Sequence, residues 1–92
     1  MTIQSSEIEI NGAWIEQNGK MVADPNSVRI ADLIANKLLK LAVADGGFST
    51  LYVNQSDSRL WELSYPQSDG HGGGPPRLSQ ISSEDASLKY KF

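Results

Sequence analysis

The sequence predicts an α+β fold, in which an antiparallel sheet of about four to five strands carries one long helix on a face, followed by a short C-terminal helix. The predicted order is β-β-α-β-β-(β)-α. Short apolar runs are joined by turn dipeptides such as Asn11-Gly12 and Asn18-Gly19, which is typical of hairpins. One central stretch has apolar residues at spacings of three and four, which is typical of a helix. Because hairpins dominate and no parallel crossover is required, an antiparallel sheet is the simplest arrangement.

The composition indicates one globular domain, residues 1–92, with 39% apolar and 21% charged residues. The absence of cysteine excludes disulfides and thiolate metal sites and favours a reducing compartment. No stretch approaches the ~18 uninterrupted apolar residues of a membrane span, and the N-terminus lacks a signal-peptide pattern. We therefore expect a cytoplasmic protein without a membrane partner. The net charge of −3 argues against nonspecific binding to nucleic acid and favours a positively charged partner.

The N-terminal part is predicted to be extended. Ile8 and Ile10 alternate with glutamates, which indicates a short strand or an arm, with residues 1–7 loosely held. The runs 13–17 and 20–24 then predict a hairpin around Asn18-Gly19, with Trp14 and Val22 as contributors to the core.

A helix is predicted from Asp24 to about Ala44. Asp24 suits the N-cap and Pro25 the first helical position. The apolar stripe consists of Ile30, Leu33, Ile34, Leu38 and Leu41. Asp45-Gly46-Gly47 is predicted to end the helix, since glycine readily adopts the left-handed cap.

A second hairpin is predicted from residues 48–54 and 59–65, joined by the polar turn 55–58. Tyr52 and Trp61 are expected in the core, and Arg59 is expected to pair with Asp57 or Glu62 on the surface. Residues 77–81 are predicted to add a short edge strand. Ser82 then suits the N-cap of a terminal helix.

The segment after this hairpin is unusually rich in glycine and proline. Its predicted structural residues are Pro66, Gly72, Gly73, Gly74, Pro75 and Pro76. A plain connection needs only two to five residues, so a specific shape is being built. One interpretation is purely structural, with the glycines packed against the sheet so that backbones approach closely.

The same loop carries the chemistry-bearing residues of the chain, and none of them predicts a cofactor. One histidine, His71, beside Asp69 is too few ligands for an ordinary zinc site. Ser68, Asp69 and His71 supply the residue types of a nucleophilic triad, but they are also ordinary loop residues that cap backbone amides. The glycines lack the Lys-Ser/Thr of a phosphate-binding loop and lead into prolines, which have no amide donor. A small enzyme or an anion- or phosphate-binding domain using residues 68–77 remains the alternative.

A recognition surface is the other interpretation of this region. Tyr65 lies where the strand becomes a loop, and Arg77 follows the prolines. Tyrosine and arginine are favoured anchors of protein interfaces. Tyr65, His71 and Arg77 around a rigid loop therefore form a candidate partner-binding edge.

Two motifs in this part of the chain are similar to a known family. Residues 61–68, WELxYPQS, and residues 71–78, HGGGPPxL, resemble the segment shared by the immunity protein 27 family of bacterial polymorphic toxin systems. The similarity extends upstream through residues 29–34 and Leu51-Tyr52, and downstream to Ile81-Ser82 and Lys89-Tyr90. Asp57-Ser58 and Gly47-Phe48 depart from the Asp-Gly and Gly-Trp expected of the family.

The resemblance implies a stoichiometric inhibitor that binds a cognate toxin and has no catalytic residues. Such a protein needs only a rigid surface, because pre-organisation lowers the free energy lost on ordering. If the toxin has a basic cleft, the acidic candidates to face it are Glu16, Asp57, Glu62 and Asp69.

Overall fold

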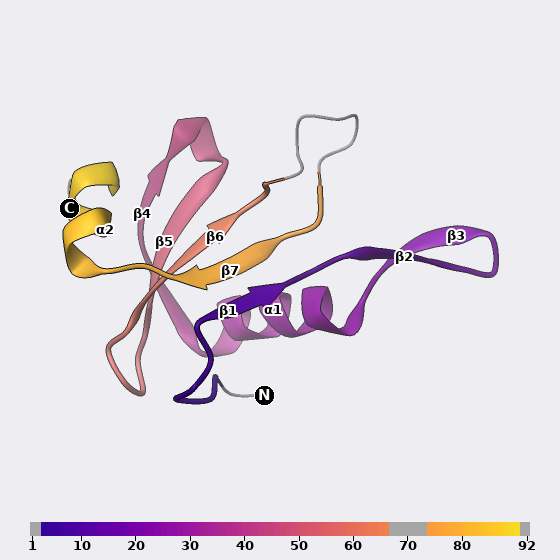
Figure 1. Ribbon diagram of the computed structural model, residues 1–92, viewed down its shortest axis with the longest axis horizontal. Helices are drawn as coiled ribbons and strands as arrows, with labels where there is room; N and C mark the ends of the chain where they lie inside the picture. The colour runs from indigo at the N-terminus through magenta and orange to yellow at the C-terminus, as the bar shows by residue number, and fades with distance from the viewer. Residues whose placement is uncertain (1–2, 67–73, 91–92) are drawn as a thin grey trace.

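The computed structural model describes residues 3–66 and 74–90, and within them five strands form one antiparallel sheet (Figure 1). Two further strands form a separate hairpin. In spatial order the sheet contains β1 (Glu9–Asn11), β7 (Arg77–Gln80), β6 (Leu60–Ser64), β5 (Ser49–Asn54) and β4 (Leu38–Ala44). With helices α1 (Pro25–Asn36) and α2 (Ser83–Tyr90), the predicted α+β class is confirmed.

Helix α1 begins as predicted but ends eight residues early. The Asp24 carboxylate accepts a hydrogen bond from the Ser27 amide at 2.8 Å, and Pro25 occupies the first turn. Lys37 leaves the helical region, with φ −122° and ψ −26°. The predicted continuation to Ala44 is wrong because residues 38–44 pair with β5 instead, from Leu38 opposite Asn54 to Ala44 opposite Ser49.

The error has a physical reason. In the segment LLKLAVA, apolar side chains satisfy the helical spacing and the alternation of a strand equally well. Pairing with β5 makes this segment a strand and not a helix, and such pairing with a distant segment cannot be seen from the local sequence. Leu38 still enters the core, but Leu41 is exposed at a bulge between Lys40 and Ala42. The predicted helix end is instead η1 (Asp45–Gly47), a 3-10 turn that joins β4 to β5.

The two faces of the sheet are each covered by one helix. Successive residues of β5 point to opposite faces, with Tyr52 opposite Trp61 and Leu51 opposite Glu62. The larger cluster, on the α1 side, contains Ile10, Ile30, Leu33, Leu38, Tyr52, Trp61, Leu63 and Leu78. The smaller cluster, on the α2 side, joins Leu51 to Ala86 and Tyr90. The expectation that Tyr52 and Trp61 are core residues is confirmed.

The second hairpin and the cap of the terminal helix are also confirmed. Strands β5 and β6 pair in antiparallel register, and the Ser82 hydroxyl accepts a hydrogen bond from the Asp85 amide at 3.1 Å. The prediction of β7 as an edge strand is wrong. β7 lies between β6 and β1, because the N-terminal strand adds outside it. Neither helix in the described part of the chain has the length and apolar character needed to cross a membrane.

Strands β2 (Trp14–Gln17) and β3 (Lys20–Ala23) form the predicted first hairpin, here called the arm (residues 14–23). The arm extends away from the sheet, to the right in Figure 1. The prediction that Trp14 is a core residue is wrong, since 45% of it is exposed, while Val22 is half-buried. A two-stranded ribbon has no second layer of its own to cover a tryptophan.

Candidate functional site

The part of the chain that the structure describes has no enclosed pocket. It also has no group of three or more histidine, cysteine, aspartate or glutamate side chains placed to hold a metal ion. Five of the loop residues considered above, Ser68, Asp69, His71, Gly72 and Gly73, lie outside the described residues. The other partner-binding candidates lie at four separate places, one of which brings Tyr65 and Arg77 together.

Tyr65 and Arg77 lie at the end of the sheet from which the glycine-rich loop departs. Ser64 of β6 pairs with Arg77 of β7, and Tyr65 follows directly, 36% exposed. Arg77 donates to the Glu9 carboxylate from Nε at 2.6 Å and from Nη2 as well. These hydrogen bonds lower the pKa of Glu9. Two of the seven candidate residues are therefore neighbours in the fold.

Tyr65 is also close enough to Tyr52 of the core to affect its pKa. Burial raises the pKa of Tyr52, and the nearby Tyr65 phenol raises it further. Directly before β7, Gly74, Pro75 and Pro76 are half-buried. The Pro76 carbonyl accepts a hydrogen bond from the Gly12 amide at 2.8 Å. The end of the loop is thereby attached to Gly12, two residues before the arm.

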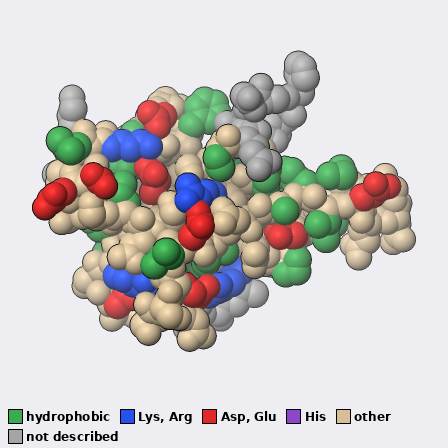
Figure 2. Space-filling model, in the orientation of Figure 1, with side chains coloured by type: hydrophobic (Ala, Val, Ile, Leu, Met, Phe, Trp, Pro, Cys, Tyr) green, Lys and Arg blue, Asp and Glu red, His purple; other side chains and the backbone are tan. Residues whose placement is uncertain are grey.

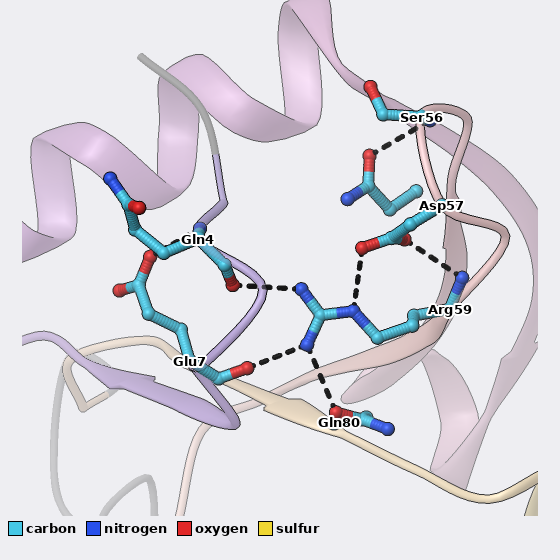
Figure 3. A network of polar contacts seen from close by, with 7 residues as sticks. Gln4, Glu7, Ser56, Asp57, Arg59 and Gln80 are labelled. Atoms are coloured by element: carbon cyan, nitrogen blue, oxygen red, sulfur yellow. Dashed lines mark hydrogen bonds and ion pairs between the residues drawn. The ribbon is translucent and has the colours of Figure 1, made fainter.

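Asp57 lies at the opposite end of β6, where it holds Arg59 (Figure 3). Arg59 Nε donates to Asp57 Oδ2 at 2.7 Å, so the predicted pairing of Arg59 with Asp57 is confirmed. The Arg59 guanidinium also donates to the carbonyls of Glu7 (2.7 Å) and Gln4 (2.9 Å). It stacks over the Trp61 ring with 5.0 Å between Cζ and the ring centroid. Asp57 and Arg59 thus fasten the N-terminal segment to the sheet.

Glu62 is engaged beneath α2, and its side chain is only 16% exposed. It accepts a hydrogen bond from Tyr90 Oη at 2.6 Å and forms an ion pair with Lys89 Nζ at 2.8 Å. The Glu62 carboxylate raises the pKa of Lys89, and burial together with Glu62 raises the pKa of Tyr90. These contacts hold the terminal helix on the sheet.

Glu16 lies on the arm, among exposed apolar side chains. Trp14 pairs with Ala23 and Glu16 with Met21, so these four side chains share one face of the ribbon. Ile15 pairs with Val22 on the other face. Ile15 and Met21 are exposed, Met21 by 65%. Figure 2 shows hydrophobic side chains gathered along the arm. Over the rest of the described residues, here called the body, charged side chains are interspersed.

Sequence reasoning missed this apolar surface because it assigned Trp14 to the core. A signal was present: Trp14 and Ile15 are consecutive, so a strand must direct them to opposite faces. A ribbon of two strands cannot bury both faces. Apolar residues on both faces of a short hairpin therefore indicate either a buried strand or an exposed binding element.

Residues 12, 13 and 24, here called the root of the arm, are fixed by a network of polar contacts. The Ala13 amide lies within hydrogen-bonding distance of Asp24 Oδ1 (3.1 Å) and Ser27 Oγ (3.2 Å). The Asp24 amide donates to the Ala13 carbonyl at 3.1 Å. At Gly12 a Cβ would lie 2.3 Å from Ser27 Oγ and 2.8 Å from the Pro76 carbonyl oxygen, so the chain passes where only glycine fits. The arm is thus held in one orientation relative to α1.

A second group of exposed apolar side chains lies along and after β4. It consists of Leu39, Leu41, Val43 and Phe48. In the described residues β4 has one strand neighbour, β5, and its other edge is open. Lys40 and the bulge at Leu41 are features that hinder pairing with a strand of another chain. The arm has neither a bulge nor a central lysine.

No curated protein and no solved structure matches this chain. The family model described as Immunity protein 27 matches residues 16–82, which is more than half of the chain and includes most of the arm, α1 and the sheet strands from β4 to β7. This match confirms the resemblance carried by the WELxYPQS and HGGGPPxL segments. The chain therefore belongs to the immunity protein 27 family.

Proposed function

We propose that this chain neutralises a toxin protein by binding it directly in a one-to-one complex. The observation that carries the proposal is the family match over residues 16–82. In this proposal the toxin belongs to a bacterial polymorphic toxin system, and the chain acts in the cytoplasm without a cofactor, a nucleic acid or catalysis of its own.

The arrangement of the candidate residues supports a binding surface. Glu16 and Tyr65 are exposed, and Arg77 is half-buried beside Glu9 at the same end of the sheet as Tyr65. We assign the toxin contacts to these three residues, together with Asp69 and His71 of the loop outside the described residues. Asp57 and Glu62 are held within the chain, so in this proposal they maintain the surface and add to its negative potential.

The test is a titration of toxin activity with the purified chain, using the polypeptide encoded beside this chain's gene as the toxin. A stoichiometric inhibitor removes activity in proportion to its amount and reaches completion at one equivalent. A chain that inactivated the toxin enzymatically would do so at a tenth of an equivalent, given time. Light scattering on the mixture should give the mass of a one-to-one complex. If the toxin stays fully active at excess chain, and the two proteins elute separately at micromolar concentration, the proposal is wrong.

A further inference from the structure

We propose that the arm is the docking element for the toxin, and that its Trp14–Glu16 face receives an arginine or lysine side chain of that partner. This inference rests on the proposed function and specifies where and with what chemistry the toxin is bound. Trp14 and Glu16 are two residues apart on β2 and point to the same side.

Glu16 is an acid that no cation of the described residues pairs with. In the part of the chain that the structure describes, it forms no ion pair and no side-chain hydrogen bond. The one lysine of the arm, Lys20, pairs with Gln17 and therefore lies on the other face. A carboxylate next to an exposed indole ring is thus available to an external cation.

The body of the protein contains a similar arrangement of a tryptophan and an acid, with the cation already bound. There, the Arg59 guanidinium stacks over the Trp61 ring while it pairs with the Asp57 carboxylate at 2.7 Å. An aromatic face and an acid bind an arginine together, because the ring quadrupole and the carboxylate both attract the guanidinium. The Trp14–Glu16 face presents the ring and the acid on the surface, and the partner supplies the cation.

The shape of the arm agrees with a role in docking. Its second face carries Ile15 and Val22, so a partner that grips the ribbon from both sides removes apolar surface from water. The contacts of Gly12, Ala13 and Asp24 at the root fix its direction before binding. Pre-organisation of this kind reduces the conformational entropy that association would otherwise remove.

Charge distinguishes a basic toxin surface from a second copy of this chain. A symmetric dimer through the Trp14–Glu16 face would bring two Glu16 carboxylates into one interface, with no cation on either face to separate them. Each copy also carries a net charge of −3. A basic partner is therefore favoured over self-association.

The experiment compares Glu16→Lys with Glu84→Lys, which makes the same charge change at an exposed acid of α2. Affinity for the toxin polypeptide encoded beside this chain's gene is measured by calorimetry. Glu16→Lys is expected to weaken binding by about tenfold or more, because a lysine repels the incoming cation. Trp14→Ala is expected to weaken it by about 30-fold, as for a central interface anchor. Glu84→Lys is expected to change it by less than about twofold.

A second readout does not depend on substitution. The chain has two tryptophans, so labelling with 5-fluorotryptophan gives two fluorine signals. In the free chain a soluble paramagnetic agent should broaden the Trp14 signal and spare that of Trp61, which is fully buried. In the complex Trp14 should become protected and shift.

The outcomes separate this inference from the proposed function. If the wild-type chain fails to bind the toxin, the proposed function is wrong and the inference falls with it. If the wild type binds, but both arm variants bind equally well and Trp14 stays accessible, only this inference is overturned. Concentration-dependent self-association that protects Trp14 without toxin would also overturn it, because the occupant would then be a second copy.

Discussion

The two tryptophans of this chain both lie on strands but in opposite surroundings. Trp61 on β6 is 0% exposed, whereas Trp14 on β2 is 45% exposed. β6 has a strand on each side, β5 and β7, and α1 belongs to the cluster that covers the Trp61 face. Among the described strands, β2 has only β3 beside it. Alternation along a strand decides which way a side chain points, but the number of neighbouring strands and layers decides whether it is buried.

The comparison extends to the charged neighbours of each ring. Over Trp61 lies Arg59, which is already paired with the acid Asp57, whereas on the face of Trp14 the acid Glu16 is available to a partner. The first arrangement stabilises the fold and the second suits binding. If this distinction is correct, substitutions in the body should change stability, while substitutions in the arm should change affinity.

The largest expected effect is at the tryptophans themselves. Trp61→Ala should lower the free energy of unfolding by about 3–5 kcal/mol, because it empties the centre of the core. Trp14→Ala should lower it by only about 1–2 kcal/mol, since 45% of the residue is already in water. Urea denaturation of both variants measures this. Equal losses would show that Trp14 is a structural residue.

The root of the arm should be the next most sensitive place. Gly12→Ala is expected to lower the free energy of unfolding by about 1–3 kcal/mol, because the added methyl group overlaps Ser27 Oγ and the Pro76 carbonyl. In the Ser27→Ala background the loss should be smaller, since one obstacle is gone. Chemical denaturation of the two single variants and the double variant gives the coupling. Strict additivity would mean that Ser27 does not restrict the chain at Gly12.

In the N-terminal segment, the stabilising effect of one ion pair can be tested by changing the pH. The Arg29 guanidinium donates to Glu7 at 2.6 and 2.7 Å and lowers the pKa of that carboxyl from 4.5 to about 2. A depressed folded-state pKa contributes stability above the unfolded pKa, and this contribution is lost as the pH falls towards the folded one. At pH 6 the free energy of unfolding of the wild type should therefore be higher than that of Glu7→Gln. The difference should be only roughly 1 kcal/mol, because the ion pair is partly exposed.

Denaturation of both proteins at several pH values tests this expectation. The difference in unfolding free energy should shrink from about pH 5 downwards and become small near pH 2. A difference that does not change with pH would mean that the glutamate acts through packing and not through its charge.

The smallest effect is expected on the exposed face of the arm. Met21→Ser should change the free energy of unfolding by less than about 0.5 kcal/mol, because the side chain is 65% exposed. Thermal denaturation is sufficient to measure it. A marked loss would indicate that the arm packs against another part of the molecule.

Local signals in the sequence predicted much of the fold. Both hairpins, the Asp24 cap with Pro25 and the Ser82 cap depend on residues within a few positions of one another, and they were predicted correctly. Three features depend on distant pairing and were missed. These are the strand at residues 38–44, the position of β7 inside the sheet, and the exposure of Trp14.

The candidate site was less predictable for the same reason. Sequence alone placed Glu62 and Asp57 among the acids facing a partner. It predicted the pairing of Arg59 with Asp57, but it could not show that Tyr90 and Lys89 engage Glu62. Those contacts join segments up to 28 residues apart. The assignments of Asp69 and His71 remain predictions, because both residues lie outside the described part of the chain.

Hydrogen–deuterium exchange of the chain with and without the toxin polypeptide tests the central claim most directly. If the arm is left uncovered for the partner, amides within residues 14–23 should exchange measurably in the free chain and slow in the complex, while those of β6 should be slow in both states. A complex in which residues 14–23 exchange as in the free chain, with protection confined to α2 or β4, would contradict the account.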